Sequence, residues 1–132
     1  MIGMDFSPQL VFVYGTLRRG GSNDFRMAGA EFITAGTVAG RIYRIDWYPG
    51  LVLDDAGDEI HGEVYAVDEE LLAELDLFEG LSAGEIEGSE YRRVPATVVC
   101  KDSRILTAWV WEWLGITDES QRLHDGDWLK TE

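Results

Sequence analysis

The sequence has a single cysteine and few basic residues, and each shortage excludes a class of protein. Cys100 has no second cysteine to pair with, so an intramolecular disulfide is impossible. Lys and Arg total 11 against 25 Asp and Glu, which gives a formal net charge of -14 at pH 7. This charge argues against nucleic acid and anionic membranes as partners, because basic patches provide most of the affinity for both. The imbalance is greatest in residues 45–91, where fifteen acidic residues occur without Lys or Arg, and most of these are interpreted as solvated surface.

Signals for membranes, metals and cofactors are also missing. No apolar run reaches the roughly 18 residues of a membrane helix, and no signal peptide or lipidation motif is visible. We therefore expect a cytoplasmic protein. His61 and His124 are far apart and lack ligand spacing, and neither a phosphate-binding loop nor a dinucleotide fingerprint occurs. We accordingly expect no metal and no cofactor.

The remaining composition is that of a folded domain. The chain has 132 residues, of which 45% are hydrophobic, so residues 1–132 are predicted to form one domain with its own core. No internal repeat is visible, and we favour a monomer.

Most apolar segments are predicted to be strands. Residues 10–14 form a continuous apolar run, which is typical of a strand covered on both faces. Residues 31–46 are predicted to form two strands, 32–38 and 41–46, with a break near Gly40. Further strands are expected at 51–53, 60–67, 91–101 and 104–113, and one helical turn within 24–30.

One clear helix is predicted between Asp68 and Phe78. Asp68 is a favourable N-cap, and Gly80 suits the left-handed residue that ends a helix. Many short strands with one helix predict an α+β fold, a small mixed β-barrel of about six or seven strands. A single helix cannot supply the crossovers of a doubly wound sheet.

The helical periodicity makes Glu79 the candidate for proton transfer. On a helical wheel Glu79 falls on the same arc as the core-facing leucines. The other helix acids fall outside that arc, with the last at its border: Glu69, Glu70, Glu74 and Asp76. A carboxylate in such surroundings has a raised pKa, which suits a general acid/base near neutral pH. The alternative is a solvated glutamate at a frayed helix end.

The turn after the first strand is the candidate for ligand binding. Successive backbone N–H groups after Gly15 can form a small anion-binding concavity that suits a carboxylate. The alternative is an ordinary strand that ends at a glycine.

Taken together, these segments resemble the gamma-glutamylcyclotransferase-like family, especially its small gamma-glutamylamine cyclotransferase branch. The likeness extends over most of the chain through short motifs in the same order and spacing. They are FVYGTLR with Asn23, GRIY, YPGLV, GEVY, LDLFEG, YRRV and GDW, which begin at residues 12, 40, 48, 62, 75, 91 and 126.

The resemblance implies a mixed barrel and a cofactor-independent cyclotransferase of lyase or acyltransferase type. A gamma-glutamyl amide would cyclise to 5-oxoproline and release an amine, with Glu79 as the catalytic general acid/base. The substrate-binding residues would be Tyr14, Gly15, Thr16, Leu17 and Tyr91, with the amides of residues 15–17 on the α-carboxylate. At most one of Arg92 and Arg93 would point inward, because they alternate on a strand.

One departure from the family pattern leaves the substrate open. The loop of residues 81–90 is long and adds Glu85, Glu87 and Glu90, so it could cover the pocket or favour a cationic leaving amine. Two other functions remain as alternatives. One is a non-catalytic module that binds a small amino-acid-like ligand in the same pocket. The other is an acidic interaction domain that uses this loop.

Overall fold

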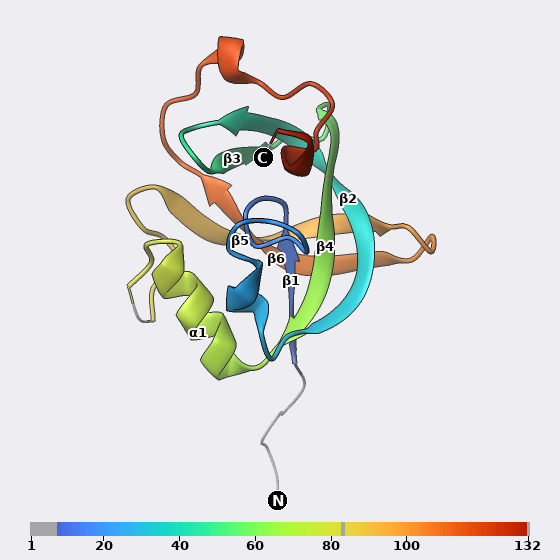
Figure 1. Ribbon diagram of the computed structural model, residues 1–132, viewed down its shortest axis with the longest axis vertical. Helices are drawn as coiled ribbons and strands as arrows, with labels where there is room; N and C mark the ends of the chain where they lie inside the picture. The colour runs from blue at the N-terminus through green and yellow to red at the C-terminus, as the bar shows by residue number, and fades with distance from the viewer. Residues whose placement is uncertain (1–7, 83, 132) are drawn as a thin grey trace, which may run out of the picture.

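Six strands form the body of the molecule in a computed structural model that describes residues 8–82 and 84–131. Their order in the sheet is β3-β2-β4-β1-β6-β5, and a further pairing of β2 with β5 closes five of them into a barrel with β3 as an extra strand. The pair β1–β6 is parallel and the others are antiparallel. The strands are β1 (Gln9–Val13), β2 (Glu31–Arg44), β3 (Pro49–Leu53), β4 (Asp58–Val67), β5 (Tyr91–Cys100) and β6 (Ile105–Trp113). The predicted mixed barrel is confirmed (Figure 1).

Strand β1 is buried on both faces, as its unbroken apolar sequence predicts. Its side chains alternate between two separate cores, because neighbouring residues of a strand point to opposite faces. Phe12 belongs to the core that contains Ile42 and Leu51, whereas Val11 and Val13 pack in the core that contains the helix leucines. The strand therefore ties the barrel to the helix, and its C-terminal end carries the turn that begins at Gly15.

Strand β2 corrects one prediction. The break expected near Gly40 is wrong, because Glu31–Arg44 is a single strand. Gly40 is the residue at which the pairing passes from β4 to β3. A Cβ atom there would lie 2.7 Å from the carbonyl oxygen of Val52, so glycine permits a close approach of two strands and does not end one.

The helix α1 (Glu69–Phe78) begins and ends where its caps predict. The side chain of Asp68 accepts a hydrogen bond from the Leu71 amide at 2.7 Å. At the other end Gly80 has a φ of 87°, and the amide of Leu81 donates to the Asp76 carbonyl at 2.8 Å. This Schellman arrangement reverses the chain directly after Glu79. Glu79 is therefore held at a defined helix end and not in a frayed one.

The C-terminal segment folds back over the barrel (Figure 1). Its two short 3-10 helices are η2 (Glu119–Gln121) and η3 (Trp128–Lys130), and Trp128 is fully buried in the barrel core. A third, η1 (Asp24–Met27), is the helical turn predicted within residues 24–30. No helix in the described part of the chain is long and apolar enough to cross a membrane.

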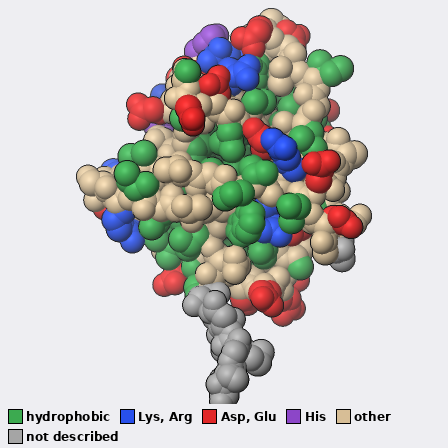
Figure 2. Space-filling model, turned by 180° about the vertical axis from the view of Figure 1, so that it is seen from behind, with side chains coloured by type: hydrophobic (Ala, Val, Ile, Leu, Met, Phe, Trp, Pro, Cys, Tyr) green, Lys and Arg blue, Asp and Glu red, His purple; other side chains and the backbone are tan. Residues whose placement is uncertain are grey.

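The acidic side chains are spread over the surface. On the face shown in Figure 2, Asp and Glu side chains lie mostly around the margin, whereas hydrophobic side chains lie across the middle. This distribution agrees with the interpretation of most acids as solvated surface.

Candidate active site

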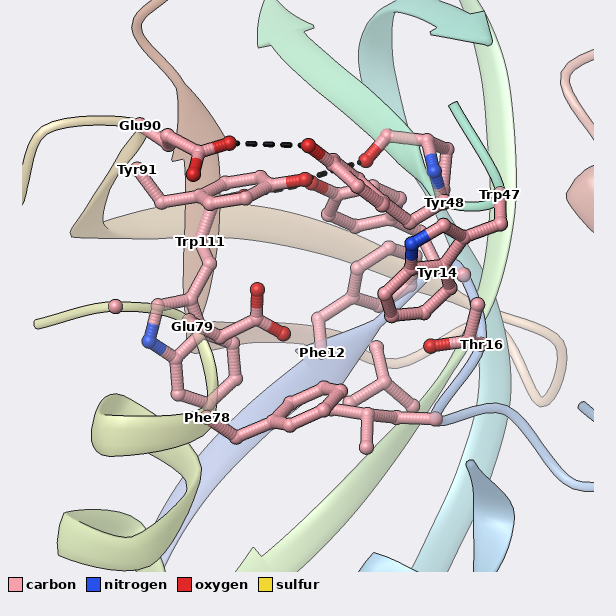
Figure 3. Close-up of a pocket in the computed structure, with 15 residues that line it drawn as sticks. Phe12, Tyr14, Thr16, Trp47, Tyr48, Phe78, Glu79, Glu90, Tyr91 and Trp111 are labelled. Carbon is pink, nitrogen blue, oxygen red and sulfur yellow. Dashed lines mark hydrogen bonds between the residues drawn. The ribbon is translucent and has the colours of Figure 1, made fainter. Parts of the chain in front are cut away.

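A cavity of about 240 Å³ lies where four segments meet beside the barrel. These segments are the turn after β1, the β2–β3 connection, the end of α1 and the start of β5 (Figure 3). All six residues chosen from the sequence line it: Tyr14, Gly15, Thr16, Leu17, Glu79 and Tyr91. The volume is slightly below the roughly 300–1,000 Å³ of pockets for drug-sized ligands, so the cavity suits a molecule of amino-acid size.

Glu79 directs its carboxylate into this cavity, as Figure 3 shows. The side chain is half-buried, and within residues 8–82 and 84–131 no side-chain hydrogen bond or ion pair engages the carboxylate. Burial, together with the negative charges of Asp76 and Glu90, raises the pKa of Glu79 to about 8. The carboxyl group therefore exchanges its proton near neutral pH and is free to do so with a ligand.

Asp76 departs from the helical-wheel prediction. The helical wheel places Asp76 just outside the buried arc, but in the structure the residue is only 8% exposed. Its Oδ1 accepts hydrogen bonds from Arg93 Nε and from Trp111 Nε1, both at 2.9 Å. Two donors from the barrel thus compensate the buried charge, which a helical wheel cannot represent. Asp76 places a fixed negative charge one helical turn before Glu79.

The two arginines of β5 do not line the cavity. Arg93 forms an ion pair with Asp76. Its guanidinium group also lies over the ring of Trp109, and its central carbon is 4.4 Å from the ring centroid. Arg92 pairs with Glu112 at 2.8 Å on the other face of the strand. Their alternation on the strand is as predicted. Among the described residues that line the cavity there is no Arg, Lys or His.

The turn after β1 presents unused backbone donors. The amide of Arg18 donates to the Gly15 carbonyl at 3.0 Å and so closes the turn. The amides of Gly15, Thr16 and Leu17 have no acceptor in the described part of the chain. Unpaired amides next to a cavity can bind an anion such as a carboxylate. A Cβ atom on Gly15 would lie 2.6 Å from Pro49 Cγ, so glycine lets the turn pack closely against the cavity wall.

Arg18 anchors this turn, a role that the sequence did not reveal. Its Nε lies 2.6 Å from Glu63 Oε2 on β4, and its Nη1 lies 2.8 Å from Asp127 Oδ1 in the C-terminal segment. The other oxygen of Glu63 accepts the Arg19 amide at 2.9 Å. The turn is therefore fixed to two distant segments. Asp127 belongs to the C-terminal GDW motif, so the first and the last of the sequence motifs are in direct contact.

The two predicted tyrosines form walls, and their hydroxyls bond to the protein. Tyr14 donates to the Trp111 carbonyl at 2.7 Å and accepts the Leu51 amide at 3.3 Å. Tyr91 donates to the Pro49 carbonyl at 2.7 Å. Burial raises the pKa of both phenols. Their protons stay in place, and the rings shape the cavity.

Trp47, Tyr48 and Glu90 also line the cavity, although none of them was a predicted site residue. The sequence placed Glu90 in the loop that could cover the pocket, whereas it gave Trp47 and Tyr48 no role there. The Tyr48 hydroxyl donates to Glu90 Oε2 at 3.0 Å, and the Trp47 ring packs edge-on against Tyr48 with 4.9 Å between centroids. The sequence feature that could have indicated Trp47 and Tyr48 is that two aromatic residues stand together in a turn just before Pro49.

The raised pKa of Glu79 predicts a pH-dependent stability. Between pH 4.5 and about 8 the folded protein keeps a proton that the unfolded chain releases, so the free energy of unfolding falls as the pH rises. A difference of one bound proton changes the free energy of unfolding by up to about 1.4 kcal/mol per pH unit. Urea unfolding of the wild type and Glu79→Gln at several pH values measures this. The wild type should lose stability relative to the variant across that interval, and a constant difference would contradict the burial of the carboxyl group.

Comparisons with known proteins find relatives that match most of the chain. The sequence model described as "Gamma-glutamyl cyclotransferase, AIG2-like" matches residues 11–130. A Vibrio cholerae protein with the provisional name gamma-glutamylcyclotransferase is 39% identical over 129 residues, covering 92% of this chain and 96% of the relative. Human gamma-glutamylaminecyclotransferase is 41% identical over 86 residues, covering 56% and 55%. The crystal structure of a mouse AIG2-like protein has a TM-score of 0.72 at 26% identity, covering 86% of this chain and 82% of that one.

Proposed function

Because this chain belongs to the gamma-glutamyl cyclotransferase, AIG2-like family, we propose that it converts a gamma-glutamyl amide into 5-oxoproline and a free amine, with Glu79 as the general acid/base. The observation that carries the proposal is that the carboxylate of Glu79 and the amides of residues 15–17 meet in one cavity, and that neither has a partner among the described residues. One group can move a proton and the other can hold an anion. A gamma-glutamyl amide needs both, because its α-ammonium must be deprotonated while its α-carboxylate is held.

The reaction is an exchange of one amide bond for another. The α-amino nitrogen attacks the side-chain carbonyl carbon, and the bond from that carbon to the leaving nitrogen breaks. Of the three protons on the α-ammonium, one stays on the lactam nitrogen and two end on the released amine as it becomes an ammonium. No water is consumed. Glu79 accepts a proton from the attacking nitrogen and returns one to the leaving nitrogen.

The pKa of Glu79 suits this exchange. The ammonium of a peptide N-terminus has a pKa of about 7.7–8.0, and the free α-carboxylate of this substrate makes its ammonium a weaker acid than that. The raised pKa of Glu79, about 8, brings the carboxylate closer to this range, which is favourable for a general base that must also act as an acid. An ordinary glutamate with a pKa near 4.5 would be a much weaker base toward the same ammonium.

Much of the remaining catalysis would come from conformation. The attack is intramolecular, so the protein needs only to hold the glutamyl chain folded back on itself. Amides of residues 15–17 on the α-carboxylate fix one end of the chain. The walls of Tyr14, Tyr91 and Trp111 limit the space that is left for extended conformers.

Product analysis tests the proposal. The purified protein is incubated with a panel of gamma-glutamyl amides in ¹⁸O-labelled water, and the products are identified by mass spectrometry. We expect unlabelled 5-oxoproline together with the free amine. Labelled glutamate would indicate hydrolysis and contradict the cyclisation. A rise in melting temperature without any product from the panel would favour the binding module instead.

A further inference from the structure

The cavity extends from the proposed reaction centre to a rim formed by Trp47, Tyr48 and Glu90 (Figure 3). If the α-carboxylate lies on the amides of residues 15–17 and the α-amino group faces Glu79, the leaving amine lies toward this rim. The following inference therefore rests on the proposed function. It concerns which amine the rim accepts.

The charges around the cavity have one sign. Glu79 and Glu90 are the two residues with a carboxyl side chain that line it, and none of the described residues in its lining is basic. A leaving group with a carboxylate would meet Glu90 without any cation to balance the repulsion. A leaving group with a second ammonium would be attracted, both by Glu90 and by the strongly acidic protein around it.

Glu90 is held in place at the rim. Its backbone carbonyl accepts the Leu114 amide at 2.7 Å, and its side chain accepts the Tyr48 hydroxyl at 3.0 Å. That bond uses Oε2, and within residues 8–82 and 84–131 Oε1 has no hydrogen-bond or ion-pair partner. The carboxylate can thus receive a cation without first giving up its bond to Tyr48.

The rim also offers aromatic faces. Trp47 is 57% exposed, and its ring meets Tyr48 edge-on at an interplanar angle of 78°. An ammonium near the face of a tryptophan or tyrosine ring is attracted by the ring quadrupole, and the exposed Trp47 ring is accessible to one. The rim therefore combines a fixed carboxylate with two aromatic rings, which is the chemistry that recognises an alkylammonium group.

We propose that Trp47, Tyr48 and Glu90 form a subsite for a second positive charge on the leaving amine, so that the preferred substrates are gamma-glutamyl amides of diamines or polyamines. The amine leaves through its acylated nitrogen, by the same exchange of bonds as above. Its distal ammonium stays bound at the rim during the reaction. Amino acids are poorer leaving groups at this site because of their carboxylate.

Three substrates of equal chain length test the proposal. Their leaving groups are a linear diamine, an alkylamine and an ω-amino acid. We expect kcat/KM to be highest for the diamine, by roughly tenfold over the alkylamine, and lowest for the amino acid. Equal values for diamine and alkylamine, or a preference for the amino acid, would overturn the subsite while leaving the proposed function intact. If none of the three releases 5-oxoproline, the proposed function itself fails.

Variants of the rim identify the residues responsible. Glu90→Gln keeps an oxygen for Tyr48 but removes the charge, so the ratio of kcat/KM for diamine over alkylamine should fall toward one. Trp47→Leu should lower the same ratio by a smaller factor. Glu87→Gln is the matched control, because Glu87 is an exposed acid of the same loop that does not line the cavity. An unchanged ratio in Glu90→Gln, or an equal fall in Glu87→Gln, would contradict the assignment.

Discussion

Glu79→Gln is expected to lower kcat for 5-oxoproline release by about 10²–10⁴-fold, the usual contribution of general acid/base catalysis. Glutamine has nearly the same shape but cannot accept the proton of the attacking ammonium. Because the Glu79 carboxylate makes no hydrogen bond or ion pair within the described residues, the substitution removes no contact that holds the fold. The variant should therefore stay folded and bind the substrate with a similar KM. Initial rates of 5-oxoproline formation, measured across a range of substrate concentrations, separate the two parameters.

Glu74→Gln is the control for this experiment. Glu74 lies on the same helix but is exposed to solvent, so Glu74→Gln makes the same chemical substitution without touching the cavity. Its kcat should equal that of the wild type. Full activity in Glu79→Gln would show that another group carries the proton. An equal loss in both variants would point to the charge of the helix and not to one carboxylate.

Arg18→Met is expected to cost about 3–5 kcal/mol of folding stability, because it leaves a buried carboxylate without its partner. Glu63 is only 7% exposed. Arg18 forms ion pairs with both Glu63 and Asp127. The substitution also releases the turn whose amides are proposed to hold the substrate. KM should therefore rise along with the loss of stability. Urea unfolding and initial-rate measurements check the two effects.

A neighbouring arginine provides the control. Arg19 is exposed, and its contact with Glu63 is made by its backbone amide, which a side-chain substitution does not remove. Arg19→Met should therefore stay close to the wild type. The double variant Arg18→Met with Glu63→Gln should recover part of the lost stability, since it no longer buries a charge. If Arg18→Met were as stable as Arg19→Met, the anchoring role would be wrong.

The elements of the fold were largely predictable because their signals are local. The two caps of α1 and the apolar run of β1 each depend on a few neighbouring residues. The break assigned to Gly40 was wrong because glycine also serves close contacts between strands, and only the position of Val52 shows which applies. A single sequence does not contain that distance.

The candidate site likewise has some features that local sequence predicts and others that depend on distant contacts. The helical period turns Glu79 inward, and no distant information is needed for that direction. The burial of Asp76, in contrast, depends on donors from β5 and β6, which reach it only when the barrel closes. Trp47 and Glu90 are far apart in the sequence and meet at one rim for the same reason. Contacts between distant segments therefore account for what the sequence left open.

The most direct test of the central claim is a crystal structure of Glu79→Gln with a gamma-glutamyl alkylamide bound. We predict that the substrate's α-carboxylate accepts hydrogen bonds from the amides of residues 15–17. Its α-amino nitrogen should lie within about 2.6–3.2 Å of the side chain at position 79. An α-carboxylate bound elsewhere, or a side chain at position 79 turned away from the α-amino group, would contradict the account.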